Sequence, residues 1–279
     1  MSYTVSVHWL RNRMQFDETL AIIDTRYELS DPTLGNKLYL KSHIPGAIYF
    51  DLKEDLSGPV KKHGGSHPLP KIDTFAKTLS DHGIDHITTV VIYDDGGSMY
   101  AARAWWMLHY MGHQSVFILD GGFNEWVKKG YDVSAEIPVR ERKEFTPQPL
   151  NIVAHMDEVK EKLQNNSAVL IDSRARERYL GKEEPLYHKA GHIPGAKNFF
   201  WKEVFDEAGF WKDAEALENH FTSLQTSDEI IVSCGSGVSA CPNIVALKMA
   251  GFENVKLYPG SFSDWISYED NPLSTEDES

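Results

Sequence analysis

The sequence predicts an α/β protein of two similar domains, each a mainly parallel sheet flanked by helices. Three observations support this fold class. The chain of 279 residues has the length of two domains of common size. Its motifs occur twice in the same order, and short β-branched runs alternate with helical stretches, as in proteins built from βαβ units.

Four pairs of motifs carry the internal repeat. Each half has an apolar run ending in Asp-Thr/Ser-Arg, a His-Ile-Pro-Gly-Ala turn, a β-branched run before a small-residue loop, and a Gly-x-Phe-x-x-Trp segment. A unit of this size indicates domain duplication rather than a solenoid. The pairs are Leu20–Arg26 with Val169–Arg174, His43–Ala47 with His192–Ala196, Val90–Asp94 with Ile230–Cys234, and Val116–Trp126 with Val255–Trp265.

The elements of each half follow from local patterns. Short β-branched runs are typical of buried parallel strands, and Met99–Tyr110 and Asn243–Met249 are expected to be helices between them. In the His-Ile-Pro-Gly turn, proline presets φ and glycine accepts a positive φ. The proline-containing, basic segment Ser134–Leu150 is predicted to link the domains. We therefore expect a first domain over residues 1–144, a linker to about residue 150, and a second domain over residues 151–279.

Charge and composition exclude several classes of function. A formal net charge of −13 argues against a nucleic-acid or anionic-membrane partner, since both require a basic surface. No apolar run approaches the roughly 20 residues of a membrane helix, and the first residues do not resemble a secretory signal. The two cysteines, Cys234 and Cys241, cannot build a disulfide framework. These features predict a cytoplasmic protein.

The two halves differ where chemistry is expected. After the third motif the first half reads Asp94-Asp-Gly-Gly, whereas the second reads Cys234-Gly-Ser-Gly-Val-Ser-Ala240. The thiol of Cys234 is thus predicted at the carboxyl end of a parallel strand, where ligands bind in open α/β sheets. Backbone N–H groups of the loop and the following helix would stabilise a thiolate there. Cys234 is the candidate nucleophile, and Cys241 is interpreted as a structural residue.

Other chemistries fit this loop poorly. A tyrosine-phosphatase loop, Cys-x5-Arg, needs an arginine to clamp phosphate, and Ala240 occupies that position. No His/Cys/Asp grouping has metal-ligand spacing, and no Gly-x-Gly-x-x-Gly follows a strand. Neither a metal nor another cofactor is therefore expected.

Over nearly its whole length the chain resembles the tandem-rhodanese sulfurtransferases, the thiosulfate and 3-mercaptopyruvate enzymes. The resemblance rests on the two His-Ile-Pro-Gly-Ala motifs, the Asp-Ser-Arg-x3-Arg-Tyr-x-Gly run over residues 172–181, and the Cys234 loop. It implies an inactive first domain, a catalytic second domain and a site in the cleft between them. Asp94 at the nucleophile position of the first copy agrees with that division.

The resemblance also implies roles for residues of the loop. Mercaptopyruvate enzymes carry Cys-Gly-Ser-Gly-Val-Thr and thiosulfate enzymes Cys-Arg-Lys-Gly-Val-Thr, so Gly235 and Ser236 indicate the mercaptopyruvate type. The loop residues Gly235, Gly237, Val238 and Ser239 are expected to bind the donor. Ser236 would act in a relay whose histidine is matched by His43 and whose aspartate is matched by Asp31. His43 has an alternative interpretation, because its recurrence as His192 is also typical of a turn-stabilising residue.

Two arginines bind the donor in the mercaptopyruvate enzymes. Arg178 matches the first, but Tyr187, beside His188, stands where the second would fall. This departure leaves thiosulfate open as an alternative donor. The resemblance thus implies a sulfurtransferase that moves sulfane sulfur from 3-mercaptopyruvate, through a persulfide on Cys234, to cyanide, a thiol or a thioredoxin-like protein. A rhodanese module that only binds or senses is the remaining alternative.

Overall fold

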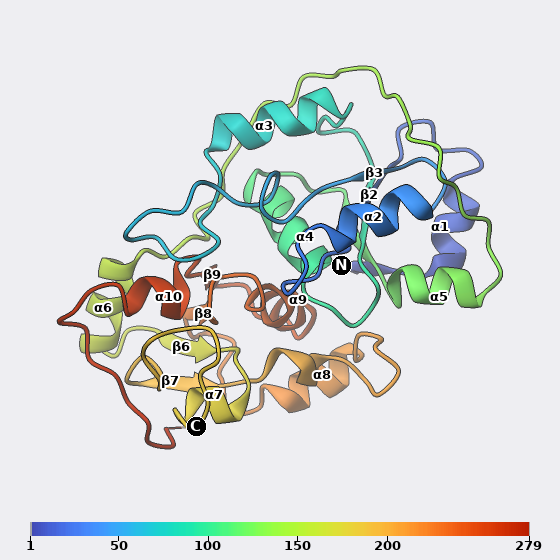
Figure 1. Ribbon diagram of the computed structural model, residues 1–279. Coiled ribbons are helices and arrows are strands. Elements are labelled where there is room, and N and C mark those ends of the chain that lie inside the picture. Colours follow the sequence, from blue (N-terminus) through green and yellow to red (C-terminus); the bar gives the residue numbers. More distant parts are fainter. Residues whose placement is uncertain (1, 279) are drawn as a thin grey trace. The chain divides into compact units, whose positions relative to one another are not determined.

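The computed structural model describes residues 2–278, which form two compact units (Figure 1). The first unit comprises Met1–Gly58, Pro70–Leu150 and Phe205–Trp211, and the second comprises Pro59–Leu69, Asn151–Val204 and Lys212–Ser279. The main boundary between the two units along the chain therefore lies after Leu150, at the end of the proline-containing segment. Each unit also includes one short segment from the other half of the sequence.

The first unit contains a five-stranded parallel sheet with the strand order β1-β5-β4-β2-β3. Parallel neighbours need long crossover connections, which the helices of this unit supply. Its strands are β1 Thr4–Val5, β2 Ala21–Asp24, β3 Ala47–Tyr49, β4 Val90–Tyr93 and β5 Val116–Leu119. Its helices are α1 Val7–Arg13, α2 Leu34–Lys41, α3 Ile72–Asp81, α4 Tyr100–Tyr110 and α5 Gly122–Lys128.

Helices pack on both faces of this sheet. On one face, apolar residues of α1 and α5 form a core with Ile22 of β2 and Val91 of β4. Side chains of a strand alternate between the two faces of the sheet, so the residues of β4 on either side of Val91 point to the opposite face. Helix α4 contacts β4 and β5. The strands are buried on both faces, which explains why they appear in the sequence as continuous apolar runs.

The second unit repeats this design with a four-stranded parallel sheet in the order β7-β6-β8-β9. Its strands are β6 Val169–Asp172, β7 Ala196–Asn198, β8 Ile230–Ser233 and β9 Val255–Leu257. Its helices are α6 Met156–Gln164, α7 Arg176–Tyr179, the 3-10 helix η1 Trp201–Val204, α8 Ala214–His220, α9 Cys241–Met249 and α10 Ser261–Trp265.

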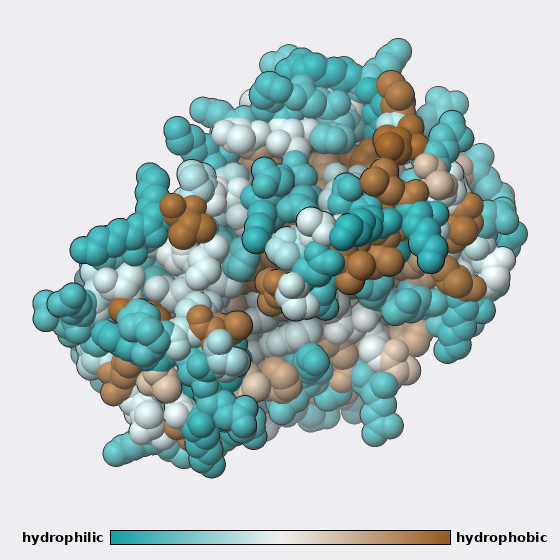
Figure 2. Space-filling view, viewed as in Figure 1, coloured by the Kyte–Doolittle hydropathy of each residue, from teal (hydrophilic) through white to brown (hydrophobic). Residues whose placement is uncertain are grey.

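Helix α9 is the buried helix of the second unit. It contacts β8, β9 and α8, while α6 and α10 contribute to the core on the other face. It begins at Cys241, two residues before the start expected from the sequence, because Pro242 lies in its first turn, where proline needs no N–H partner. Hydrophilic residues cover most of the face shown in Figure 2, with apolar residues interspersed among them.

The duplication extends to buried polar contacts. In the first unit the Arg26 guanidinium forms a two-pronged ion pair with Asp24, and in the second Arg174 forms the same pair with Asp172. The shortest N–O distance is 2.6 Å in both. Asp-x-Arg after the first motif strand is thus a structural feature of both copies.

The two segments that join the opposite unit have matching positions along the chain. Phe205–Trp211 packs on the first unit, where the backbone N–H of Trp211 donates to Asp120 at 3.0 Å. Pro59–Leu69 packs on the second unit, where Gly64 N–H donates to Asp264 at 2.7 Å. The segment Pro59–Leu69 supplies residues that lie next to the Cys234 loop.

Candidate active site at Cys234

Cys234 directly follows β8, and its side chain is 1% exposed. Residues 234–240 form a loop that leads into α9, the element order that the sequence predicted. Gly237 N–H donates to the Cys234 sulfur over 3.1 Å. The sulfur therefore lies within a turn of small residues at the start of a helix, a position that favours negative charge.

Gly237 is the residue that this turn requires. Its φ of +79° is strained for any other residue, and an added Cβ would lie 2.3 Å from the carbonyl oxygen of Pro259. The backbone of the loop therefore packs directly on the strand-to-helix turn of residues 258–261. This close packing fixes the position of the N–H group that contacts sulfur.

Ser261, which the sequence analysis missed, completes the surroundings of the sulfur. Its hydroxyl accepts a hydrogen bond from Cys234 N–H at 3.1 Å, donates to the carbonyl of Tyr258 at 2.8 Å, and lies 4.0 Å from the sulfur. Its side chain is fully buried. The signal that could have found it is the repeat itself, because Ser261 occupies the position of Gly122 in the first copy.

Ser236 contacts a histidine on the segment Pro59–Leu69. Its hydroxyl oxygen lies 2.9 Å from Nδ1 of His67, a hydrogen-bond distance. Ser66 N–H donates to the Ser263 hydroxyl at 3.0 Å, and His63 Nδ1 lies 2.7 Å from the Ser267 hydroxyl. These contacts hold the segment against α10 and the residues that directly follow it. The serine–histidine pair is thus built within the second unit.

The histidine at hydrogen-bond distance from Ser236 is thus His67, whereas His43, which the resemblance implied for that position, has other contacts. His43 lies in the first unit, with Nδ1 2.7 Å from the carbonyl of Tyr39 and Nε2 3.0 Å from the carbonyl of Glu136. Backbone carbonyls engage both of its ring nitrogens. His192 has the same contact in the second unit, with Nδ1 2.7 Å from the Tyr179 carbonyl, as the alternative interpretation of a turn-stabilising histidine predicts.

The contacts of Asp31 are with residues of its own turn and of α2. It is a surface residue whose carboxylate accepts hydrogen bonds from the N–H and hydroxyl of Thr33 and lies 3.7 Å from Lys37. Hydrogen bonds from Thr33, above all from its hydroxyl, lower the pKa of this carboxyl. Asp31 therefore stabilises the local turn before α2.

Arg178 and Tyr187 lie near one another in the second unit. Arg178 is in the single-turn helix α7, which Tyr179 anchors by donating to the carbonyl of Ala196 at 2.7 Å. The Arg178 guanidinium carbon is 5.6 Å from the centre of the Tyr187 ring. A Cβ on Gly235 would lie 3.0 Å from the Tyr187 hydroxyl, which places this phenol beside the Cys234 loop. His188, in contrast, is exposed.

The remaining residues of the Cys234 loop differ in how far they are exposed to solvent. Gly235 and Val238 are buried, and Ser236 and Ser239 are half-buried. Cys241 is fully buried, and its thiol donates to the carbonyl of Gly237 at 3.4 Å. Its contact is thus with the loop backbone. Among the described residues, no group of three His, Cys, Asp or Glu side chains is arranged to bind a metal ion.

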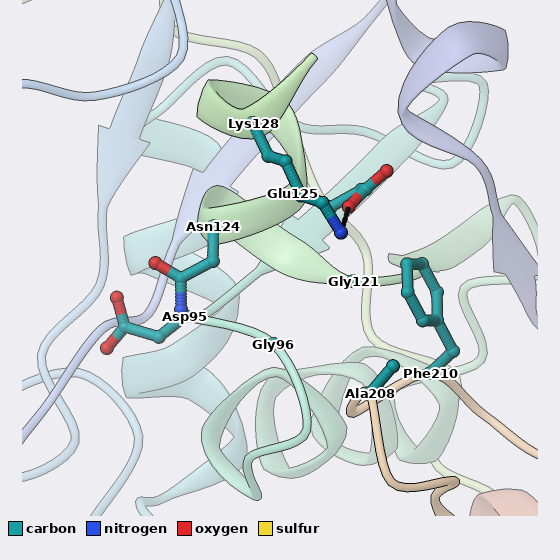
Figure 3. A pocket seen from close by; sticks show the side chains of 8 residues that line it. All are labelled: Asp95, Gly96, Gly121, Asn124, Glu125, Lys128, Ala208 and Phe210. Carbon is teal, nitrogen blue, oxygen red and sulfur yellow. Dashed lines mark ion pairs between the residues drawn. The ribbon is translucent and has the colours of Figure 1, made fainter.

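The corresponding loop of the first unit holds a carboxylate in place of the thiol. Asp94 accepts hydrogen bonds from the N–H groups of Gly96 and Ala101, both at 2.9 Å. Beside it lies a pocket of about 120 Å³ in which Phe210 approaches Gly121 and an ion pair joins Glu125 to Lys128 (Figure 3). No cysteine occurs in this loop, so it cannot carry sulfur.

Comparison with known proteins agrees with this architecture. The model of the rhodanese-like domain family matches residues 6–129 and 155–268. A probable 3-mercaptopyruvate sulfurtransferase of Pseudomonas aeruginosa is 38% identical, with 92% of this chain and 93% of the relative covered. The thiosulfate sulfurtransferase of Rattus norvegicus is 34% identical, with 94% and 91% covered.

A solved structure shows the same relationship. The crystal structure of SseA from Escherichia coli, described among the 3-mercaptopyruvate sulfotransferases, matches with a TM-score of 0.80 and 33% identity over 94% of this chain and 100% of that chain. The two family matches account for both repeats, and the relatives cover the chain almost from end to end. The chain therefore belongs to the rhodanese-like domain family and is a sulfurtransferase with two such domains.

Proposed function

We propose that this sulfurtransferase takes the sulfur atom of 3-mercaptopyruvate and carries it as the sulfane sulfur of a persulfide on Cys234. The observation that carries the proposal is the position of the Cys234 sulfur, 3.1 Å from Gly237 N–H in a loop whose Ser236 is bonded to His67. The N–H group stabilises a thiolate and, after transfer, the negative charge of the persulfide.

The first half-reaction breaks one carbon–sulfur bond. The Cys234 thiolate attacks the sulfur of mercaptopyruvate, a sulfur–sulfur bond forms, and the electron pair of the carbon–sulfur bond leaves with pyruvate as its enolate. Protonation of the enolate gives pyruvate. The Ser236 hydroxyl, 2.9 Å from His67, is the group in the loop that can deliver that proton. Arg178 and the loop residues Gly235, Gly237, Val238 and Ser239 would bind the donor.

The second half-reaction regenerates the thiolate. A nucleophilic acceptor attacks the outer sulfur of the persulfide, and Cys234 leaves as a thiolate. Cyanide is the acceptor in an assay, and a thiol or thioredoxin-like protein in a reducing cytoplasm. Thiosulfate is the alternative donor, because relatives with that name match nearly as well; its sulfur–sulfur bond would break and sulfite would leave.

Thiocyanate formation from cyanide tests this proposal. Wild-type protein should form thiocyanate with mercaptopyruvate at a higher kcat/KM than with thiosulfate. Cys234→Ser should abolish the reaction with both donors, and Cys241→Ser, a matched change at the other cysteine, should retain it. Equal turnover by the Cys234→Ser protein would disprove a persulfide on Cys234, whereas no turnover by the wild-type protein with either donor would favour a module that only binds.

A further inference from the structure

The carboxylate of Glu184 neutralises the arginine expected to bind the donor. Glu184 is in the loop after α7, and its side chain is 3% exposed. Arg178 Nη2 donates to its two oxygens at 2.8 and 3.0 Å, and Arg178 Nε donates to one of them at 3.2 Å. Such two-point contacts between guanidinium and carboxylate are among the stronger ion pairs of proteins. These contacts use Nε and Nη2 of Arg178, so Nη1 is the nitrogen through which we expect Arg178 to bind a donor.

Glu184 also contacts the buried Arg174. The distance from Arg174 Nη1 to a Glu184 oxygen is 3.2 Å, and Asp172 binds the other edge of the same guanidinium. Burial alone would lower the pKa of Arg174, but Asp172, Glu184 and the nearby Cys234 outweigh it and raise the pKa. The two positive charges of Arg174 and Arg178 are thus balanced by the carboxylates of Asp172 and Glu184. This cluster therefore offers no net positive charge to a donor.

Tyr187 adds no charge at the position where related enzymes have a second arginine. Burial, and then the nearby Cys234, raises the pKa of the Tyr187 phenol above its ordinary value. The phenol is therefore neutral at neutral pH. Its hydroxyl lies beside Gly235, where it offers hydrogen bonding without charge.

We propose that Glu184 sets donor specificity: by pairing with Arg178 it makes the site favour a monoanionic donor over a dianionic one. This inference rests on the proposed function of Cys234. Mercaptopyruvate has one carboxylate and a ketone, which accept hydrogen bonds from Nη1 of Arg178 and from the loop. Thiosulfate has two charges, and neither meets an unbalanced cation here. Glu184 acts through Arg178 and is a positioning residue.

The test compares two neighbouring glutamates. Glu184→Gln keeps the shape but removes the charge that balances Arg178, so the ratio of kcat/KM for thiosulfate to kcat/KM for mercaptopyruvate should rise about tenfold. Glu183→Gln removes the same charge from an exposed side chain, and the ratio should change less than about twofold. A ratio that is unchanged in Glu184→Gln, or that rises equally in both variants, overturns the inference.

A second measurement does not depend on whether Glu184→Gln folds. In the wild-type protein at constant ionic strength, sulfate should inhibit the mercaptopyruvate reaction no more strongly than pyruvate does. Stronger inhibition by sulfate shows an unbalanced positive site and overturns the inference. Sulfur loading of wild-type Cys234 separates the two proposals. If Cys234 is loaded but the kcat/KM ratio of the two donors is unchanged in Glu184→Gln, only the role of Glu184 is overturned. If neither donor loads Cys234, both proposals are overturned.

Discussion

Ser261 has the same left-handed backbone conformation as Gly122, its counterpart in the first copy of the repeat. The φ angles are 53° and 57°. A side chain at such a φ is strained, at a cost of about 1–2 kcal/mol, and residues of this kind cluster at functional sites. The hydroxyl of this strained serine accepts a hydrogen bond from the backbone N–H of Cys234 at 3.1 Å.

Replacing Ser261 separates backbone strain from hydroxyl chemistry. Ser261→Ala keeps the strain and loses the hydroxyl, whereas Ser261→Gly loses both. We expect Ser261→Gly to be more stable than Ser261→Ala by about 1 kcal/mol, and both variants to form persulfide more slowly than the wild type. Urea unfolding and single-turnover loading measure these effects. Wild-type loading rates in both variants would contradict a role for the hydroxyl.

Gly237 and Gly130 form a matched pair for the packing of the active loop. Both have positive φ, +79° and +72°, but a Cβ at Gly237 would meet the Pro259 carbonyl at 2.3 Å while a Cβ at Gly130 meets nothing within 4 Å. Gly130→Ala should cost about 1 kcal/mol of unfolding free energy, from backbone strain alone. Gly237→Ala should cost several times more and abolish sulfur transfer. Similar losses in the two variants would show that the contact with Pro259 is unimportant.

His67 should matter for one donor more than for the other. If Ser236 and His67 deliver the proton that the pyruvate enolate requires, His67→Gln should lower kcat with mercaptopyruvate by about 100-fold. Sulfite leaves thiosulfate without needing a proton, so that reaction should change little. His188→Ala, at an exposed position, is the control and should leave both rates unchanged. An equal loss with both donors would indicate that His67 only supports the loop.

Asp94 should make the stability of the protein depend on pH. Burial raises the pKa of its carboxyl to about 6, although the N–H groups of Ala101 and Gly96 oppose the shift. Since the folded state holds this proton more tightly than the unfolded state, where the pKa is about 3.9, the stabilisation is present below about pH 4 and is lost as pH rises through about 6.

Asp94→Asn removes this titration and tests its sign. The unfolding free energy of the variant relative to the wild type should increase by about 2 kcal/mol between about pH 4 and pH 7. The pH-independent effect of the substitution cancels in that difference. Urea unfolding at both pH values provides the measurement, and a difference that does not change with pH would contradict a buried, proton-holding carboxyl.

The fold could be predicted because its signals are local and repeated. The β-branched runs became β2, β4, β6 and β8, and the expected helix at Met99–Tyr110 is α4, which begins one residue later. The exchange of Pro59–Leu69 and Phe205–Trp211 between the units could not be predicted. It depends on tertiary contacts, such as Gly64 with Asp264, between residues far apart in the sequence.

The candidate site was predicted only where the two repeats could be compared. Cys234 and Ser236 differ from the corresponding residues of the first copy, which drew attention to them. His67 belongs to the run His63-Gly-Gly-Ser-His67, which has no counterpart in the other half, and its contact with Ser236 spans 169 positions. Loop residues of this kind acquire a role only through the fold, whereas His43 recurs because a turn needs it in both copies.

The mass of the intact protein after reaction with a donor tests the central claim most directly. Wild-type and Cys241→Ser proteins incubated with mercaptopyruvate, then freed of donor, should each gain the mass of one sulfur atom. Peptide mapping should place that atom on Cys234, and cyanide should remove it. An unchanged mass, or sulfur found on a residue other than Cys234, would contradict the persulfide account.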